Sequence, residues 1–137
     1  MDSKVKNQIL VDDIVETDPI EFPNSLGFGR IFSDRMFIQR FSADQGWHDA
    51  KITKYQQLSL DPATTVFHNG QMIFDGTKAY RAPNGDINLF RPRLNVDRFN
   101  RSAQRMGMPT VEPSLHLEAI KQLVKLEEKW VPDKAGT

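Results

Sequence analysis

Two stretches in the second half of the chain repeat their apolar residues at helical spacing. The first opens at Pro92 and ends at Gly107, and Pro109 prevents its continuation. Its apolar positions predict one buried helical face: Val96, Phe99, Ala103 and Met106. The second stretch, 114–131, carries a broad apolar face and a charged opposite face. Two packed amphipathic helices are therefore expected in this half of the chain.

Shorter segments alternate apolar and polar residues with the period of a β-strand. We expect strands over 35–41, 51–55, 77–81 and 86–90. Asn84 and Gly85 both tolerate a positive φ, and they predict a tight hairpin between the last two strands. Strands and helices alternate without a regular βαβ pattern, which indicates an α+β fold with a mostly antiparallel sheet.

A third helix is expected to begin at Asp61, whose carboxylate can accept hydrogen bonds from first-turn amides. Pro62 suits the first helical position because its missing N–H has no partner there in any case. One face would carry four residues: Val66, Gly70, Ile73 and Phe74. Gly76 would end the helix. Gly70 and the threonines at 64–65 are poor helix formers, so this helix would depend on tertiary packing.

Length and composition narrow the class of protein. The 137 residues suggest one domain, 25–137, preceded by a polar N-terminal arm over 1–24. The chain has no cysteine, which excludes a disulfide scaffold and a cysteine nucleophile. Eighteen basic and eighteen acidic side chains cancel, which argues against nucleic acid or anionic lipid as a partner. No apolar run approaches the ~20 residues that span a bilayer, so we expect a cytoplasmic protein.

Arginines follow the polar side of the helix opened by Pro92. Arg98, Arg101 and Arg105 project away from its apolar face. On an arbitrary helix, such a row of arginines is more often a solvent-exposed surface without a binding role. The alternative is an anion site, because a guanidinium group matches phosphate or carboxylate in bidentate fashion. Asp97 argues against phosphate binding unless its side chain points elsewhere.

Other candidate groups carry weaker signals. His48, His68 and His116 share no metal-ligand spacing, so a metal site is not expected. Gly27 and Gly29 form a GxG without the third glycine of a dinucleotide-binding loop.

Several segments in one order then resemble a known family. They include GFGRIFSDRMFI, LSLDPATTVFH, FHNGQMIFDGTKAYR, LFRPRLNVDR and LEAIKQLVKLEEKWVP. Together they resemble the small N-terminal domain of branched-chain amino-acid aminotransferases, which are pyridoxal-phosphate enzymes of fold type IV. The resemblance runs from about Leu26 to Pro132. Within the same fold, a D-amino-acid aminotransferase or an aminodeoxychorismate lyase fits these segments less well.

The resemblance implies roles for particular residues. Arg98 would hold the phosphate of pyridoxal 5'-phosphate. Phe74 and Gly76 would line the substrate side, Lys78 would lie near it without being the Schiff-base lysine, and Phe28 would help to wall the pocket. No catalytic residue is expected in this chain, because the family's catalytic lysine belongs to a C-terminal domain.

Two residues depart from the family pattern. The family commonly has tyrosine where this chain has Asn69, and glutamate where it has Asp75. Asn69 would take the tyrosine's place in the substrate-binding wall, which affects the expected substrate preference.

The implied parent enzyme would transfer the amino group of Leu, Ile or Val to 2-oxoglutarate and would form a homodimer. The 137 residues would be an inactive N-terminal fragment of it. One alternative is a stand-alone non-catalytic domain that binds a phosphorylated ligand or a protein partner. A less favoured one is RNA binding through the row of arginines on the helix opened by Pro92.

Overall fold

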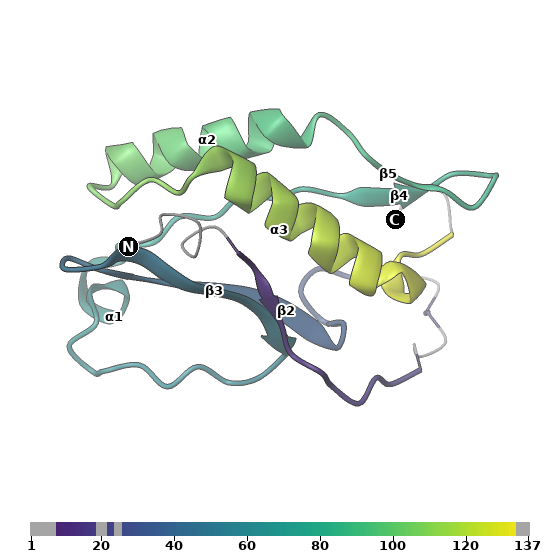
Figure 1. Ribbon diagram of the computed structural model, residues 1–137, viewed down its shortest axis with the longest axis horizontal. Helices are drawn as coiled ribbons and strands as arrows, with labels where there is room; N and C mark the ends of the chain where they lie inside the picture. Colours follow the sequence, from purple (N-terminus) through teal and green to yellow (C-terminus); the bar gives the residue numbers. More distant parts are fainter. Residues whose placement is uncertain (1–7, 19–21, 24–25, 134–137) are drawn as a thin grey trace.

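The computed structural model describes residues 8–18, 22–23 and 26–133, and its elements confirm the α+β class. The strands are β1 Leu10–Val11, β2 Arg35–Ser42, β3 Gly46–Lys54, β4 Ala79–Arg81 and β5 Ile87–Leu89. The helices are α1 Thr65–Asn69, α2 Pro92–Arg105 and α3 Pro113–Leu126, and a 3-10 turn follows at Glu128–Trp130. Helix α3 lies between α2 and the three-stranded sheet formed by β1, β3 and β2 (Figure 1).

The larger sheet is built on the hairpin of β2 and β3. These strands are antiparallel, with Phe37 opposite Ile52, whereas β1 runs parallel to β3. Strand β3 begins at Gly46, five residues before the predicted start, because only residues 43–45 are needed for the turn. Ile52 is completely buried and forms part of the core with Ala50.

Helices α2 and α3 pack against each other through small and medium-sized side chains. Val96 and Ala103 of α2 are buried, as the helical spacing predicts, and Leu115 and Ala119 are buried on α3. Small residues such as these alanines let two helix backbones approach closely. Burial of this apolar surface is the main stabilising contribution to the fold.

Helix α3 is shorter than predicted. It ends at Leu126, and the chain turns into the 3-10 segment, where the amide of Trp130 donates to the carbonyl of Glu127. The side chain of Glu127 is buried and accepts hydrogen bonds from Arg35 and from the amide of Asp34. These hydrogen bonds connect the start of β2 to the residue that directly follows the end of α3.

The helix predicted from Asp61 to Gly76 is largely wrong. Only α1 is helical, and it ends at Gly70, which is left-handed with φ 59°. The carboxylate of Asp61 accepts from the amide of Ala63, as in a turn, and residues 70–78 have no regular structure. No residue of α1 is buried, so no packing offsets the poor helix formers at 64–65 and 70.

The predicted hairpin is present but its strands are shorter. Ala79 pairs with Leu89 and Arg81 pairs with Ile87. Gly85 adopts φ 91° in the turn, as the Asn-Gly pair predicts. The guanidinium group of Arg81 donates to the backbone carbonyls of Glu128 and Val131, which fastens the hairpin to the segment after α3.

Part of the predicted N-terminal arm contacts the rest of the chain. Beyond β1, Glu16 forms an ion pair with Arg35, at 2.6 Å, and with Lys129, at 3.2 Å. The amide and hydroxyl of Thr17 both donate to Asp34. The division into an arm over 1–24 and a domain over 25–137 stays a prediction.

Candidate functional site

Three arginines of α2 line one side of an open hollow of about 460 Å³. Arg98, Arg101 and Arg105 are all exposed, so the structure confirms that they project away from the buried face. The lining residues come from α2 and from the segment before β4: Met72, Ile73, Phe74, Arg98, Arg101, Ser102, Arg105 and Met106. None of these described lining residues is acidic, so the hollow has a local excess of positive charge.

The side chain of Gln71 holds the two sides of this hollow together. Its amide nitrogen Nε2 donates to the carbonyl of Met106 at the end of α2, at 3.0 Å. Met72 and Phe74 lie one and three residues after Gln71, and both are exposed. The arrangement therefore sets an apolar edge opposite a row of guanidinium groups.

Arg98 forms a bidentate ion pair with Asp75. Nε donates to Oδ2 at 2.6 Å and Nη2 donates to Oδ1 at 2.9 Å. The Arg98 side chain is 55% exposed, whereas that of Asp75 is only 11% exposed. The hydrogen bond from Arg98 holds the pKa of the Asp75 carboxyl below its usual value, despite an opposing effect of burial. The pair is therefore ionised at neutral pH.

Asn95 binds the same short segment from one helical turn earlier. Its Nδ2 donates to the carbonyl of Gly76 at 2.8 Å and to Oδ1 of Asp75 at 3.2 Å. Because Asn95 and Arg98 are three residues apart on α2, they share one face. Neither contact with Asp75 was predicted, because the partners lie 20 and 23 residues apart in the sequence.

Asp97 does not neutralise this site. Its carboxylate accepts from Nε of Arg93 at 3.3 Å, an exposed pair one helical turn apart. Because Asp97 pairs with Arg93, its charge is not directed at Arg98 and does not argue against anion binding there.

Phe28 and Phe74 meet beside the hollow. Their ring centroids are 6.3 Å apart in an edge-to-face arrangement. Both rings are largely exposed, at 86% and 74%. Gly27 and Gly29 have φ near +65°, which turns the backbone sharply on both sides of Phe28. The sequence places these aromatic residues 46 positions apart, and the fold brings them together.

The other predicted site residues are less closely joined. Asn69 ends α1, and Lys78 directly precedes β4. Both side chains are exposed, and neither takes part in a hydrogen bond or ion pair within the described part of the chain. Gly76 is tied to α2 through Asn95. The predicted roles of these residues in substrate binding stay predictions.

Asp75 lines a separate, small cavity of about 180 Å³. Its lining includes Thr77, Phe99 and His116. The His116 ring packs edge-to-face against Phe99, with centroids 4.9 Å apart. Burial lowers the pKa of the His116 imidazole, and the negative charge of Asp75 opposes that effect.

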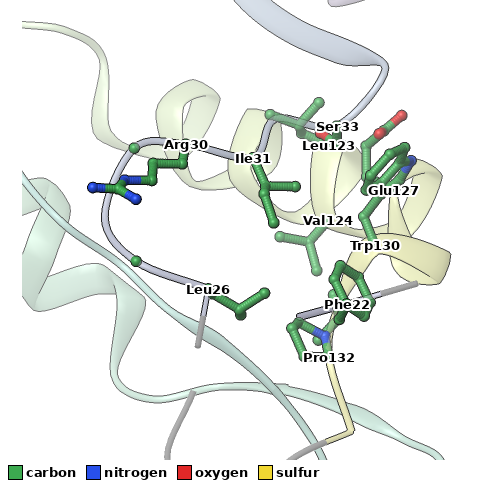
Figure 2. A pocket seen from close by; sticks show the side chains of 13 residues that line it. Phe22, Leu26, Arg30, Ile31, Ser33, Leu123, Val124, Glu127, Trp130 and Pro132 are labelled. Atoms are coloured by element: carbon green, nitrogen blue, oxygen red, sulfur yellow. The ribbon is translucent and has the colours of Figure 1, made fainter. Parts of the chain in front are cut away.

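A larger cavity, of about 400 Å³, lies between the loop 26–33 and the C-terminal end of α3 (Figure 2). Its walls are mainly apolar and include Leu26, Ile31, Leu123 and Val124. None of the predicted site residues lines it. Within residues 8–18, 22–23 and 26–133, no cluster of three histidine or acidic side chains could hold a metal ion. No helix in these ranges is long and apolar enough to cross a membrane.

Comparison with known proteins identifies similar sequences. Branched-chain-amino-acid transaminase 1 of Bacillus subtilis is 50% identical over 115 residues, which are 84% of this chain and 32% of that protein. Branched-chain-amino-acid aminotransferase 2 of the same organism is 42% identical over 132 residues, 96% of this chain and 36% of that protein. A probable branched-chain-amino-acid aminotransferase of Streptomyces coelicolor is 47% identical over 110 residues, 80% of this chain and 30% of that protein.

No protein-family model matches the chain. The chain spans about a third of the length of the curated relatives it matches. Identity of 42–50% over most of its residues is nevertheless shared with several of these enzymes. Over most of its residues, the chain is therefore similar to a segment of about a third of the length of the branched-chain aminotransferases.

Proposed function

We propose that this chain is the part of a pyridoxal-phosphate-dependent branched-chain aminotransferase that anchors the cofactor phosphate and forms one wall of the substrate pocket. The names of the curated relatives support the reaction class. The single structural observation that carries the proposal is the hollow in which Arg98, Arg101 and Arg105 face an apolar edge.

The residues of the hollow fit the phosphate group of this cofactor. Arg98 would bind it, and Arg101, Arg105 and the hydroxyl of Ser102 would add charge and a hydrogen-bond donor. Nη1 of Arg98 makes no hydrogen bond to any described residue, so part of the guanidinium group remains available. When bound, the cofactor supplies an electron sink for the charge that develops on the substrate Cα.

The aromatic pair would bind the aliphatic part of the substrate. Phe28 and Phe74 present apolar surface and exclude water from one side of the pocket. Burying a side chain of the size of Leu, Ile or Val contributes about 1.5–3 kcal/mol. Asn69, Gly76 and Lys78 complete the proposed wall.

The whole enzyme would transfer the amino group of Leu, Ile or Val to 2-oxoglutarate and act as a homodimer. In the proposed division of labour, residues outside this chain hold and move the proton at Cα. The residues of this chain bind, orient and exclude water.

Binding of pyridoxine 5'-phosphate to the 137-residue chain tests the anchor. This probe carries the phosphate ester but no aldehyde, so it cannot react with surface lysines. We expect Arg98→Gln to weaken binding at least about tenfold, because a charge-assisted hydrogen bond to an anion contributes about 1.5–3 kcal/mol. Chemical shift changes during titration give the affinity.

Arg93→Gln is the matched control, since Arg93 lies on the same helix but outside the hollow. It removes the same charge and should change the affinity little. Equal losses in the two variants would reduce the effect to general electrostatic attraction and refute a specific anchor. No loss in Arg98→Gln would also refute it.

A further inference from the structure

We propose that Asp75 is a positioning residue for Arg98: its carboxylate holds one edge of the guanidinium group so that the rest of the group is presented to an anion in the hollow. The inference rests on the proposed function, because it assumes that Arg98 binds a phosphate. It goes beyond that function by assigning a role to a carboxylate that lies outside the hollow.

The atoms of the ion pair divide the guanidinium group into two parts. Asp75 occupies Nε and Nη2, at 2.6 and 2.9 Å, and leaves Nη1 without a hydrogen bond to any described residue. Arg98 lines the hollow, whereas Asp75 does not. Asp75 instead lines the small cavity that contains His116. The carboxylate thus approaches Arg98 from the side away from the proposed anion.

Asp75 is the fixed member of the pair. Its side chain is 11% exposed against 55% for Arg98, and it also accepts a hydrogen bond from Asn95. Asn95 in turn binds the carbonyl of Gly76, so the backbone next to the carboxylate is tied to α2. A carboxylate held in this way can restrict the long side chain of Arg98.

Restriction matters because a free arginine side chain loses rotamer freedom when it binds an anion. A guanidinium group that is already oriented loses less, which increases affinity. Asp75 also carries a negative charge, and that charge by itself weakens anion binding. The two effects have opposite signs, so removal of the charge alone distinguishes positioning from simple repulsion.

The first experiment measures the orientation of Arg98 directly. In the 137-residue chain, the Nε–H resonance of Arg98 should be resolved and protected because of its short hydrogen bond to Asp75. In Asp75→Asn, which keeps the size of the side chain, we expect this resonance to move to the position of free arginines and to exchange rapidly with water. An unchanged resonance would overturn the positioning role, whatever the binding data show.

The second experiment measures the affinity for pyridoxine 5'-phosphate. We expect Asp75→Asn to lower the affinity by about tenfold, as the lost restriction of a long side chain implies. Asp97→Asn is the matched control: it removes the same charge next to Arg98, but Asp97 pairs with Arg93. It should leave the affinity unchanged or slightly increased. An increase in Asp75→Asn would show that Asp75 only repels the anion and would overturn the proposal, and so would no change.

Asp75→Glu supplies the conservative rescue. It restores the carboxylate on a side chain one methylene longer, and we expect it to recover both the Arg98 resonance and at least half of the lost binding free energy. Failure of both to recover would mean that the Asp75→Asn effect is only structural. If Arg98→Gln itself binds like the wild type, the proposed function fails, whereas the resonance still decides whether Asp75 positions Arg98.

Discussion

His116 is the residue whose ionisation should make the stability of this fold sensitive to mild acid. Burial lowers its pKa below the ordinary value near 6.5, so the unfolded chain binds the proton more tightly than the folded one. Its contribution to the free energy of unfolding is therefore intact above about pH 6.5 and declines as the pH falls below that value. The carboxyl groups with lowered pKa values lose their contribution only at lower pH, near and below their ordinary values of 3.8–4.5.

His116→Phe should remove this dependence. Phenylalanine keeps an aromatic ring against Phe99 and cannot be protonated. We expect the free energy of unfolding of the wild type to fall between pH 7.5 and pH 5.5 and that of the variant to stay nearly constant. Urea titrations at the two pH values measure it, and parallel losses in both proteins would contradict the assignment to His116.

For single residues, the sequence predicted which side chains are exposed better than it predicted which side chains they contact. The spacing of Arg98, Arg101 and Arg105 was sufficient to place them on the exposed face of α2, because that depends only on helical geometry. The partner of Arg98 could not be deduced in the same way. Asp75 lies 23 residues earlier, in a segment whose path the incorrect long helix misrepresented.

Elements were predicted correctly where local signals and burial agree. Helix α2 begins at its proline and ends before its glycine. Val96 and Ala103 of its predicted apolar face are buried, whereas Met106 lies beyond the last turn and is 39% exposed. The long helix predicted around α1 was wrong for two reasons. The carboxylate of Asp61 accepts from the amide of Ala63 in a turn, and no side chain of α1 is buried. Strand β1 was missed because two residues carry no detectable period, and its pairing with β3 is a long-range contact.

The link between β2 and the end of α3 gives a prediction at the scale of elements. Arg35 and Glu127 are both buried and paired at 2.8 Å. Arg35→Met leaves a buried carboxylate without its partner and should cost about 3–5 kcal/mol. Adding Glu127→Gln removes that uncompensated charge, while the amide oxygen can still accept from the amide of Asp34.

The double variant should therefore be more stable than Arg35→Met alone, by at least about 1 kcal/mol. Chemical denaturation of the two single variants and the double variant completes the cycle. Additive losses would show that the two side chains contribute independently, contrary to a coupled buried pair.

At the scale of the whole molecule, the proposed function implies binding without turnover. The resemblance places the lysine that reacts with the cofactor outside these 137 residues. We expect no glutamate to form when the purified chain is incubated with leucine, 2-oxoglutarate and pyridoxal 5'-phosphate. Bacillus subtilis branched-chain-amino-acid transaminase 1 serves as the positive control. Measurable turnover by the chain would contradict the assignment of this chemistry to other residues.

The lack of buried residues in α1 has a consequence for how the molecule opens. Between β3 and β4, the chain is fastened mainly at its second half, where Gln71, Asp75 and Gly76 bond to α2. A segment with few buried contacts unfolds locally at a small fraction of the global free energy. Amide hydrogens of α1 should therefore exchange with deuterium orders of magnitude faster than those at the centre of α2, as mass spectrometry of peptides can measure. The proposed substrate wall would then be preformed at Phe74 and adaptable at Asn69.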